Sequence, residues 1–223
     1  MDKIRQGINK MQEQKLEEAA TFFTEAIEEN PKDSLGYINF GNLLLHTHDY
    51  ERAIRFYQKA SELDPNAATA YYGLGNVYYE QSDFNKAQEN FQHAIQLGLQ
   101  EADAYFMLGL TFQQQDHHKL ALPYFQRATE LNPNDDSILF QYGLSLAQSE
   151  QIETAVKVFS DVLTINSNHS DAHYNLGVAY LFQEKPEKAF HHFEKALTIH
   201  PEHLLAANGK KKLEEMLQKK NKE

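Results

Sequence analysis

A 34-residue period in small and aromatic residues constrains this chain more than any other feature. Glycine recurs at that interval as Gly7, Gly41, Gly75, Gly109, Gly143 and Gly177, and alanine as Ala19, Ala53, Ala87, Ala121, Ala155 and Ala189. Four residues after each alanine stands an aromatic: Phe23, Tyr57, Phe91, Phe125, Phe159 or Phe193. A period of this length predicts a tandem array in which each unit buries its apolar face against its neighbours.

Each period contains two segments with the spacing of an amphipathic helix. In the stretch 68–101, apolar or small residues follow this spacing first at Tyr71, Leu74, Gly75 and Tyr78, and then at Ala87, Phe91, Ala94 and Ile95. The polar turn 81–83 separates the two segments, and Asp83 is a suitable N-cap for the second helix. Small residues on both segments allow the two helix axes to approach closely. Prolines then end the second helix at Pro31, Pro65, Pro133 and Pro201.

The order aromatic, Leu-Gly, Tyr, then Ala, Phe, Ala and Pro resembles the tetratricopeptide repeat (TPR), a helix–turn–helix unit of 34 residues. This resemblance implies an all-α solenoid, coiled as a right-handed superhelix and standing alone as a six-repeat array. The expected repeats are 1–33, 34–67, 68–101, 102–135, 136–169 and 170–203. A C-terminal capping helix is expected at 204–217 and a disordered basic tail at 218–223.

The first helix of each repeat is apolar on two faces, although the repeat contact explains only one of them. The TPR resemblance implies that the second face lines a concave groove for an extended or helical peptide. In the repeat 68–101, Tyr72, Asn76, Tyr79 and Glu80 have no evident role in the stack. The alternative is that many of these side chains contact the next repeat. The predicted groove residues are Ile38, Asn39, Asn42, Tyr72, Asn76, Tyr79, Glu80, Phe106, Leu110, Gln113, Phe140, Gln141, Tyr174, Asn175 and Val178.

Charge indicates what the groove selects. The five first-helix segments 34–47, 68–81, 102–115, 136–149 and 170–183 contain no Lys or Arg. A buried carboxylate needs cationic or amide donors, and only the amides are present here. We therefore expect a neutral or basic apolar peptide segment as the ligand, and not an acidic tail.

Composition and charge exclude several other classes of function. The 223 residues carry a net charge of −11 and no cysteine, which argues against nucleic-acid binding and excludes disulfides. No apolar run has the length of a membrane span, and the N-terminus lacks a signal-peptide core, so a cytoplasmic location is expected. The eleven histidines are scattered without a metal-ligand pattern, so no metal or other cofactor is expected.

No spacing suggests a nucleophile–base pair or a carboxylate dyad, and we therefore predict a non-catalytic scaffold for protein–protein interaction. Two alternatives stay open. One is a structural TPR protein that self-associates weakly, and the other is a regulatory subunit of a larger complex. The basic segment at Lys210–Lys212 is interpreted as part of a solvated cap helix.

Overall fold

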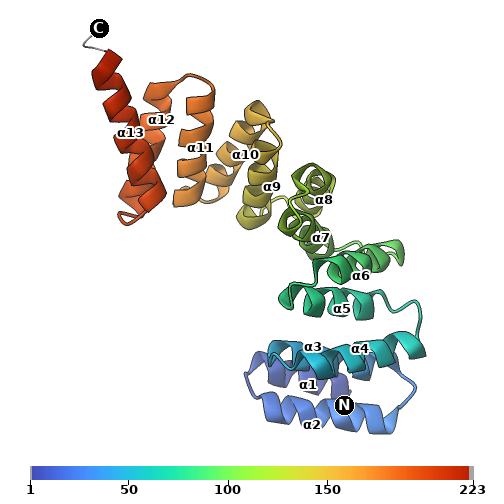
Figure 1. Cartoon of the computed structure of the whole chain (residues 1–223). Coiled ribbons are helices and arrows are strands. Elements are labelled where there is room, and N and C mark those ends of the chain that lie inside the picture. Colours follow the sequence, from blue (N-terminus) through green and yellow to red (C-terminus); the bar gives the residue numbers. More distant parts are fainter. Residues whose placement is uncertain (1, 221–223) are drawn as a thin grey trace. The chain divides into compact units, whose positions relative to one another are not determined.

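The computed structural model describes residues 2–220, which form helices joined by short turns and contain no strand (Figure 1). The thirteen helices are α1 (Lys3–Gln12), α2 (Leu16–Glu29), α3 (Ser34–His46), α4 (Tyr50–Leu63), α5 (Ala68–Glu80), α6 (Phe84–Gln96), α7 (Ala102–Gln114), α8 (His118–Leu131), α9 (Asp136–Gln148), α10 (Ile152–Ile165), α11 (Ser170–Phe182), α12 (Pro186–Ile199) and α13 (Leu204–Lys220). None of them combines the length and the apolarity needed to cross a bilayer. The all-α prediction is confirmed.

The chain divides after Gln115 into two compact units. Unit 1 holds α1–α7 and unit 2 holds α8–α13. Within each unit every helix packs against its neighbours in sequence, and odd-numbered helices also contact the next odd-numbered helix. These additional contacts are α1–α3, α3–α5 and α5–α7 in unit 1, and α9–α11 and α11–α13 in unit 2. The odd helices therefore form one layer in each unit, and all the predicted groove residues belong to this layer.

The recurring aromatic of each repeat is the centre of its core. Phe23, Tyr57, Phe91, Phe125, Phe159 and Phe193 are all completely buried. The repeat glycines make room for these rings. A Cβ added at Gly75 would lie 2.6 Å from Phe91, and one at Gly177 would lie 2.6 Å from Phe193. The predicted packing reason for the small residues is thus confirmed.

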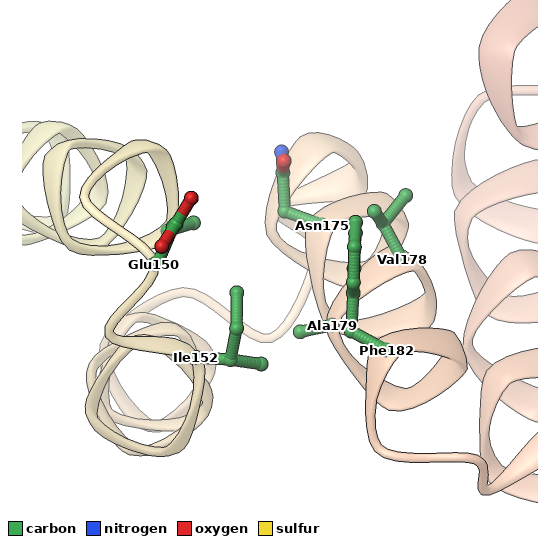
Figure 2. A pocket seen from close by; sticks show the side chains of 7 residues that line it. Glu150, Ile152, Asn175, Val178, Ala179 and Phe182 are labelled. Atoms are coloured by element: carbon green, nitrogen blue, oxygen red, sulfur yellow. The ribbon is translucent and has the colours of Figure 1, made fainter.

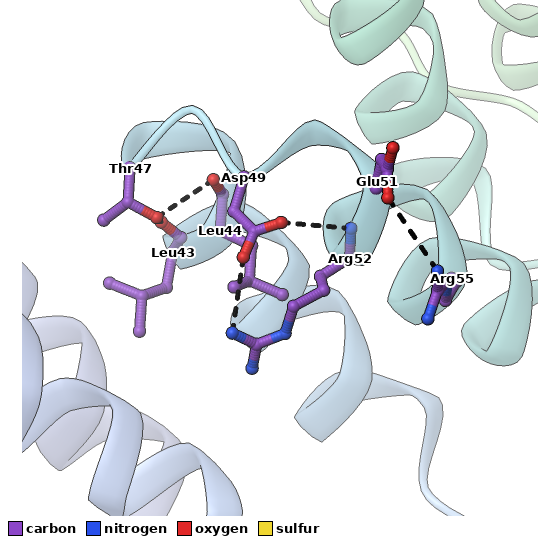
Figure 3. Close-up of polar contacts among 7 residues, drawn as sticks. All are labelled: Leu43, Leu44, Thr47, Asp49, Glu51, Arg52 and Arg55. Carbon is purple, nitrogen blue, oxygen red and sulfur yellow. Dashed lines mark hydrogen bonds and ion pairs between the residues drawn. The ribbon is translucent and has the colours of Figure 1, made fainter.

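The turn between the two helices of a repeat has one recurring geometry. Its residue in the left-handed region, with φ between 57° and 65°, is Gln14, His48, Ser82, Asp116, Glu150 or Glu184. Figure 3 shows the turn that leads into α4. The Thr47 hydroxyl donates to the carbonyl of Leu44 at 3.1 Å, and the Asp49 carboxylate accepts from the backbone N–H of Arg52 at 3.3 Å. These bonds satisfy backbone groups that a helix end leaves unpaired.

Replacing Ser82 by glycine should raise the free energy of unfolding by up to about 1 kcal/mol, because a Cβ makes the left-handed conformation unfavourable. Urea denaturation followed by circular dichroism measures the change. Ser160 provides the matched control, since it lies in the middle of α10. Glycine there should lower the free energy of unfolding by roughly a few tenths of a kcal/mol. The prediction would be contradicted if both variants changed the free energy of unfolding in the same direction.

The C-terminal helix is longer than expected. It was predicted at 204–217, but α13 runs to Lys220, so residues 218–220 of the expected tail are helical. The rest of that tail, 221–223, lies outside the described residues. Leu213 and Ala206 hold α13 against the core around Phe193.

Candidate functional site

Three predicted groove aromatics also belong to the stack. They are half-buried and each lies against the buried ring of its own repeat: Tyr72 against Phe91, Phe140 against Phe159 and Tyr174 against Phe193, with ring centroids 5.7, 5.8 and 6.0 Å apart. The Tyr79 ring similarly meets Phe84 edge-on at 5.6 Å. The expectation that Tyr72 and Tyr79 have no role in the stack is therefore wrong. In each of these aromatic residues, one side of the ring packs against another ring of the same repeat.

Ile38 was also predicted to face a ligand, and this placement is wrong. Its side chain is 5% exposed and belongs to the core of unit 1, together with Phe40 and Leu44. Isoleucine at this position continues the packed face of α3. Periodicity alone assigned it to the groove because α3 is apolar on several sides.

Two groove asparagines are held by tyrosine hydroxyls. The buried Tyr57 donates from its hydroxyl to Oδ1 of Asn42 at 2.7 Å, and burial raises the pKa of Tyr57 well above its usual value. Burial also raises the pKa of Tyr72, which a hydrogen bond with Asn76 partly offsets. The two amide N–H donors of this exposed residue remain available to a ligand, and Oδ1 keeps one lone pair beside the bond from Tyr57.

The other two groove asparagines are oriented by their own helices. The amide nitrogen of Asn39 donates to the carbonyl of Leu35, and that of Asn175 donates to the carbonyl of Asp171, both at 2.8 Å. Each keeps its Oδ1 as an acceptor. The remaining predicted residues lie on the odd layer with intermediate exposure, apart from the exposed Glu80: Phe106, Leu110 and Gln113 on α7, and Gln141 on α9.

Unit 2 contains an apolar pocket of about 420 Å³, formed where α9 ends, α10 begins and α11 passes beside them. Figure 2 shows Glu150 and Ile152 on one side, facing Asn175, Val178 and Phe182 on the other. The complete lining is Ala147, Glu150, Ile152, Asn175, Val178, Ala179 and Phe182. Its volume falls within the range of about 300–1,000 Å³ that is usual for ligand sites.

Sequence reasoning placed Asn175 and Val178 in the groove, and Phe182 on the same apolar face of its helix, but left out the other four lining residues. A signal for the pocket was nevertheless present in the repeat. Ala147 occupies a position at which the other repeats carry larger residues, namely Met11, Leu45, Tyr79, Gln113 and Leu181. The missing side-chain volume at Ala147 leaves space next to α11.

Phe182 and Glu150 give the pocket its chemical character. Phe182, the last residue of α11, is 73% exposed. Glu150 is the only charged residue of the lining, and it forms no ion pair with any side chain described between residues 2 and 218. The pocket therefore presents an apolar surface with one unneutralised carboxylate.

Two histidines come together elsewhere in unit 2. The Nδ1 atoms of His173 on α11 and His192 on α12 lie 3.0 Å apart, so one imidazole donates its proton to the other. The His192 ring also stacks on Tyr180 at 5.4 Å. Burial, followed by the nearby His173, lowers the pKa of His192 to about 4, and burial also lowers the pKa of His173. Among the residues described, no three His, Cys, Asp or Glu side chains are grouped to hold a metal.

Because His173 and His192 pack as neutral imidazoles, we predict that the protein loses stability in mild acid. The pKa of His192 in the folded protein is about 4, below its ordinary value of 6.5. Above pH 6.5 both histidines are neutral in the folded and the unfolded chain, so their packing contributes fully to the free energy of unfolding. That contribution is lost as the pH falls from 6.5 toward 4, and solvent screening of the half-buried ring keeps it below the roughly 3 kcal/mol that the full shift would give.

Urea titrations at pH 7 and pH 5 measure this loss. The variant His192→Gln should reduce the difference between the two pH values, whereas His46→Gln, at an exposed position in unit 1, should leave it unchanged. An equal pH dependence in the wild type and in His192→Gln would refute the assignment.

Comparison with known proteins shows which repeat family this architecture resembles. Models of the tetratricopeptide repeat match residues 22–55, 67–134 and 170–203, and a TPR repeat model matches 41–82. The TPR repeat-containing protein YrrB of Bacillus subtilis is 54% identical over 41 residues, a segment that spans 18% of this chain and 20% of that protein.

Solved structures extend the likeness over most of the chain. The crystal structure of YrrB, described as a TPR protein with an unusual peptide-binding site, is 46% identical, with a TM-score of 0.80 over 85% of this chain and 97% of that one. A MamA structure is 26% identical, with a TM-score of 0.70 over 75% of this chain and 92% of that one. Pseudomonas aeruginosa PilF shares the fold alone, at 19% identity and a TM-score of 0.79 over 92% of this chain and 94% of that one.

Paired helices in two layers, with buried rings at a fixed period, define a helical-repeat protein of the class that serves as a scaffold for protein interaction. The chain belongs to the tetratricopeptide repeat family, as the YrrB likeness and the matching repeat models show.

Proposed function

We propose that this protein is a non-catalytic interaction module that holds a neutral or basic apolar peptide segment on its odd-helix layer. The observation that carries the proposal is the 420 Å³ pocket of unit 2, because it is an apolar cavity lined mainly by an odd helix. YrrB, which is similar over most of this chain, is described as having a peptide-binding site, and this supports the same class of ligand.

Charge supports the expected peptide chemistry. Helices α3, α5, α7, α9 and α11 contain neither Lys nor Arg, so an acidic tail would meet no cation on them. The asparagine amides on α3 and α11 supply a donor at Asn42 and acceptors at Asn39 and Asn175. A peptide backbone has both kinds of partner group.

Fluorescence anisotropy with labelled peptides tests the proposal on the full chain. Neutral and basic apolar peptides should bind more tightly than an acidic peptide of equal length. Val178→Arg places a cation in the pocket lining and should weaken binding by about tenfold or more, which corresponds to about 1.4 kcal/mol.

Leu120→Arg is the matched control, since Leu120 is 54% exposed on α8, in the even layer of the same unit. This variant should bind as the wild type does. Tyr72→Ala is a poor test, because Tyr72 packs on Phe91 and its loss would also destabilise the repeat. Preferential binding of the acidic peptide, or unchanged binding by Val178→Arg, would refute the proposed function.

A further inference from the structure

Phe182 is an exposed aromatic that the repeat itself does not require. At the same position the other five repeats carry polar residues: Gln12, His46, Glu80, Gln114 and Gln148. Phe182 is nevertheless 73% exposed at the rim of the unit 2 pocket. A large apolar side chain in such a place, beside a cavity, is typical of a contact surface for a partner.

The space beside Phe182 arises from a second departure from the repeat. Ala147 replaces the larger residues of the other repeats, and the half-buried Ile152 and Val178 complete an apolar wall. The two departures, a smaller residue at 147 and a larger one at 182, face the same cavity. A large apolar side chain of a bound peptide would fill the space left at Ala147 and cover Phe182.

Glu150 adds a charge at a defined place. It lies in the turn between α9 and α10 with φ 65°, and its exposed carboxylate belongs to the pocket lining. The lysines that follow α11 are engaged elsewhere: Lys185 and Lys188 both lie over the ring of Tyr180, at 6.0 and 5.3 Å. Neither belongs to the lining, so Glu150 is left for a cation supplied by the ligand.

We infer that this pocket takes a large apolar anchor residue of a peptide that carries Lys or Arg within two positions of the anchor, with Glu150 selecting the basic residue. The inference rests on the proposed function and specifies the ligand of the same site. Because the charge pair is solvent-exposed, Glu150 tunes selectivity, whereas the anchor supplies most of the affinity.

The test uses the full chain and peptides with one phenylalanine anchor, flanked by either lysine or glutamate within two positions. The wild type should bind the lysine peptides at least about threefold more tightly at low salt, and this ratio should shrink in high salt as the charges are screened. Glu150→Lys should invert the preference. Glu153→Lys, an exposed α10 charge outside the lining, should retain it.

Ala147→Leu tests the cavity separately, because leucine already occupies this position in the repeats of Leu45 and Leu181. It should weaken both peptide sets by about tenfold while the circular dichroism spectrum stays native. Phe182→Ala should have the same effect.

The outcomes separate this inference from the proposed function. Equal binding of the two sets by the wild type, or no inversion in Glu150→Lys, overturns the selectivity at Glu150 and leaves peptide binding intact. Unchanged binding by both Ala147→Leu and Phe182→Ala overturns the anchor pocket. Absence of binding for every peptide overturns the proposed function as well.

Discussion

Gly73→Ala should destabilise unit 1 by about 1–3 kcal/mol, through overpacking of a core that has no free space. A Cβ at this position would lie 2.3 Å from Cε1 and 2.4 Å from Cζ of Tyr57. The Tyr57 ring cannot move aside, because a Cβ at Gly41 would also lie only 2.8 Å from it and its hydroxyl is bonded to Asn42 at 2.7 Å. Two glycines from successive odd helices thus enclose one ring.

Gly36→Ala is the matched control in the same unit. There the new Cβ would meet Cγ1 of Ile27 at 2.9 Å, in a partly buried side chain that can change rotamer. We expect less than half the destabilisation of Gly73→Ala in urea denaturation at pH 7. If Gly73→Ala were within about 0.5 kcal/mol of the wild type, the enclosed-ring account would be wrong.

Phe193→Ala should have the largest effect in unit 2, a loss of about 3–5 kcal/mol, because it removes a completely buried ring. This ring packs against two helices: Cβ atoms added at Gly177 on α11 and Gly209 on α13 would lie 2.6 and 2.9 Å from it. Its removal should therefore also loosen α13, which hydrogen exchange of the α13 amides would detect.

Phe182→Ala is the natural comparison, since the same substitution is made in the same unit at a side chain that is 73% exposed. Its effect on the free energy of unfolding should stay within about 0.5 kcal/mol, while peptide binding falls. The two phenylalanines thus separate stability from recognition. Similar losses of stability in both variants would contradict their assigned roles.

The repeat could be predicted with its packing because its signal is local and repeated. Gly75, Ala87 and Phe91 recur at fixed spacing, and each must be small or aromatic for one helix pair to close. The turn residue with positive φ recurs at the same period but carries no consistent residue type, from Gln14 to Glu184, and it was not predicted. Six copies of one pattern identify a packing rule more firmly than any single residue does.

The face available to a ligand was predicted less well, because helical periodicity gives a direction around one helix and not the contacts beyond it. Ile38 and Tyr72 share a position in their repeats, yet one is buried in the core and the other is half-exposed against Phe91. Gly73 had no role in the repeat pattern, and only the position of the Tyr57 ring from the preceding repeat explains it.

By itself, the sequence determined the helix pairs, the buried rings and the absence of Lys and Arg from α3, α5, α7, α9 and α11, since these follow from residue type at a fixed period. Tertiary structure decided which of the remaining side chains stay accessible. The pocket of unit 2 depends on a missing side chain at Ala147, a turn carboxylate at Glu150 and an exposed ring at Phe182. These residues come from separate elements, and only the packing of α9, α10 and α11 brings them together, because a cavity is a property of the space between helices.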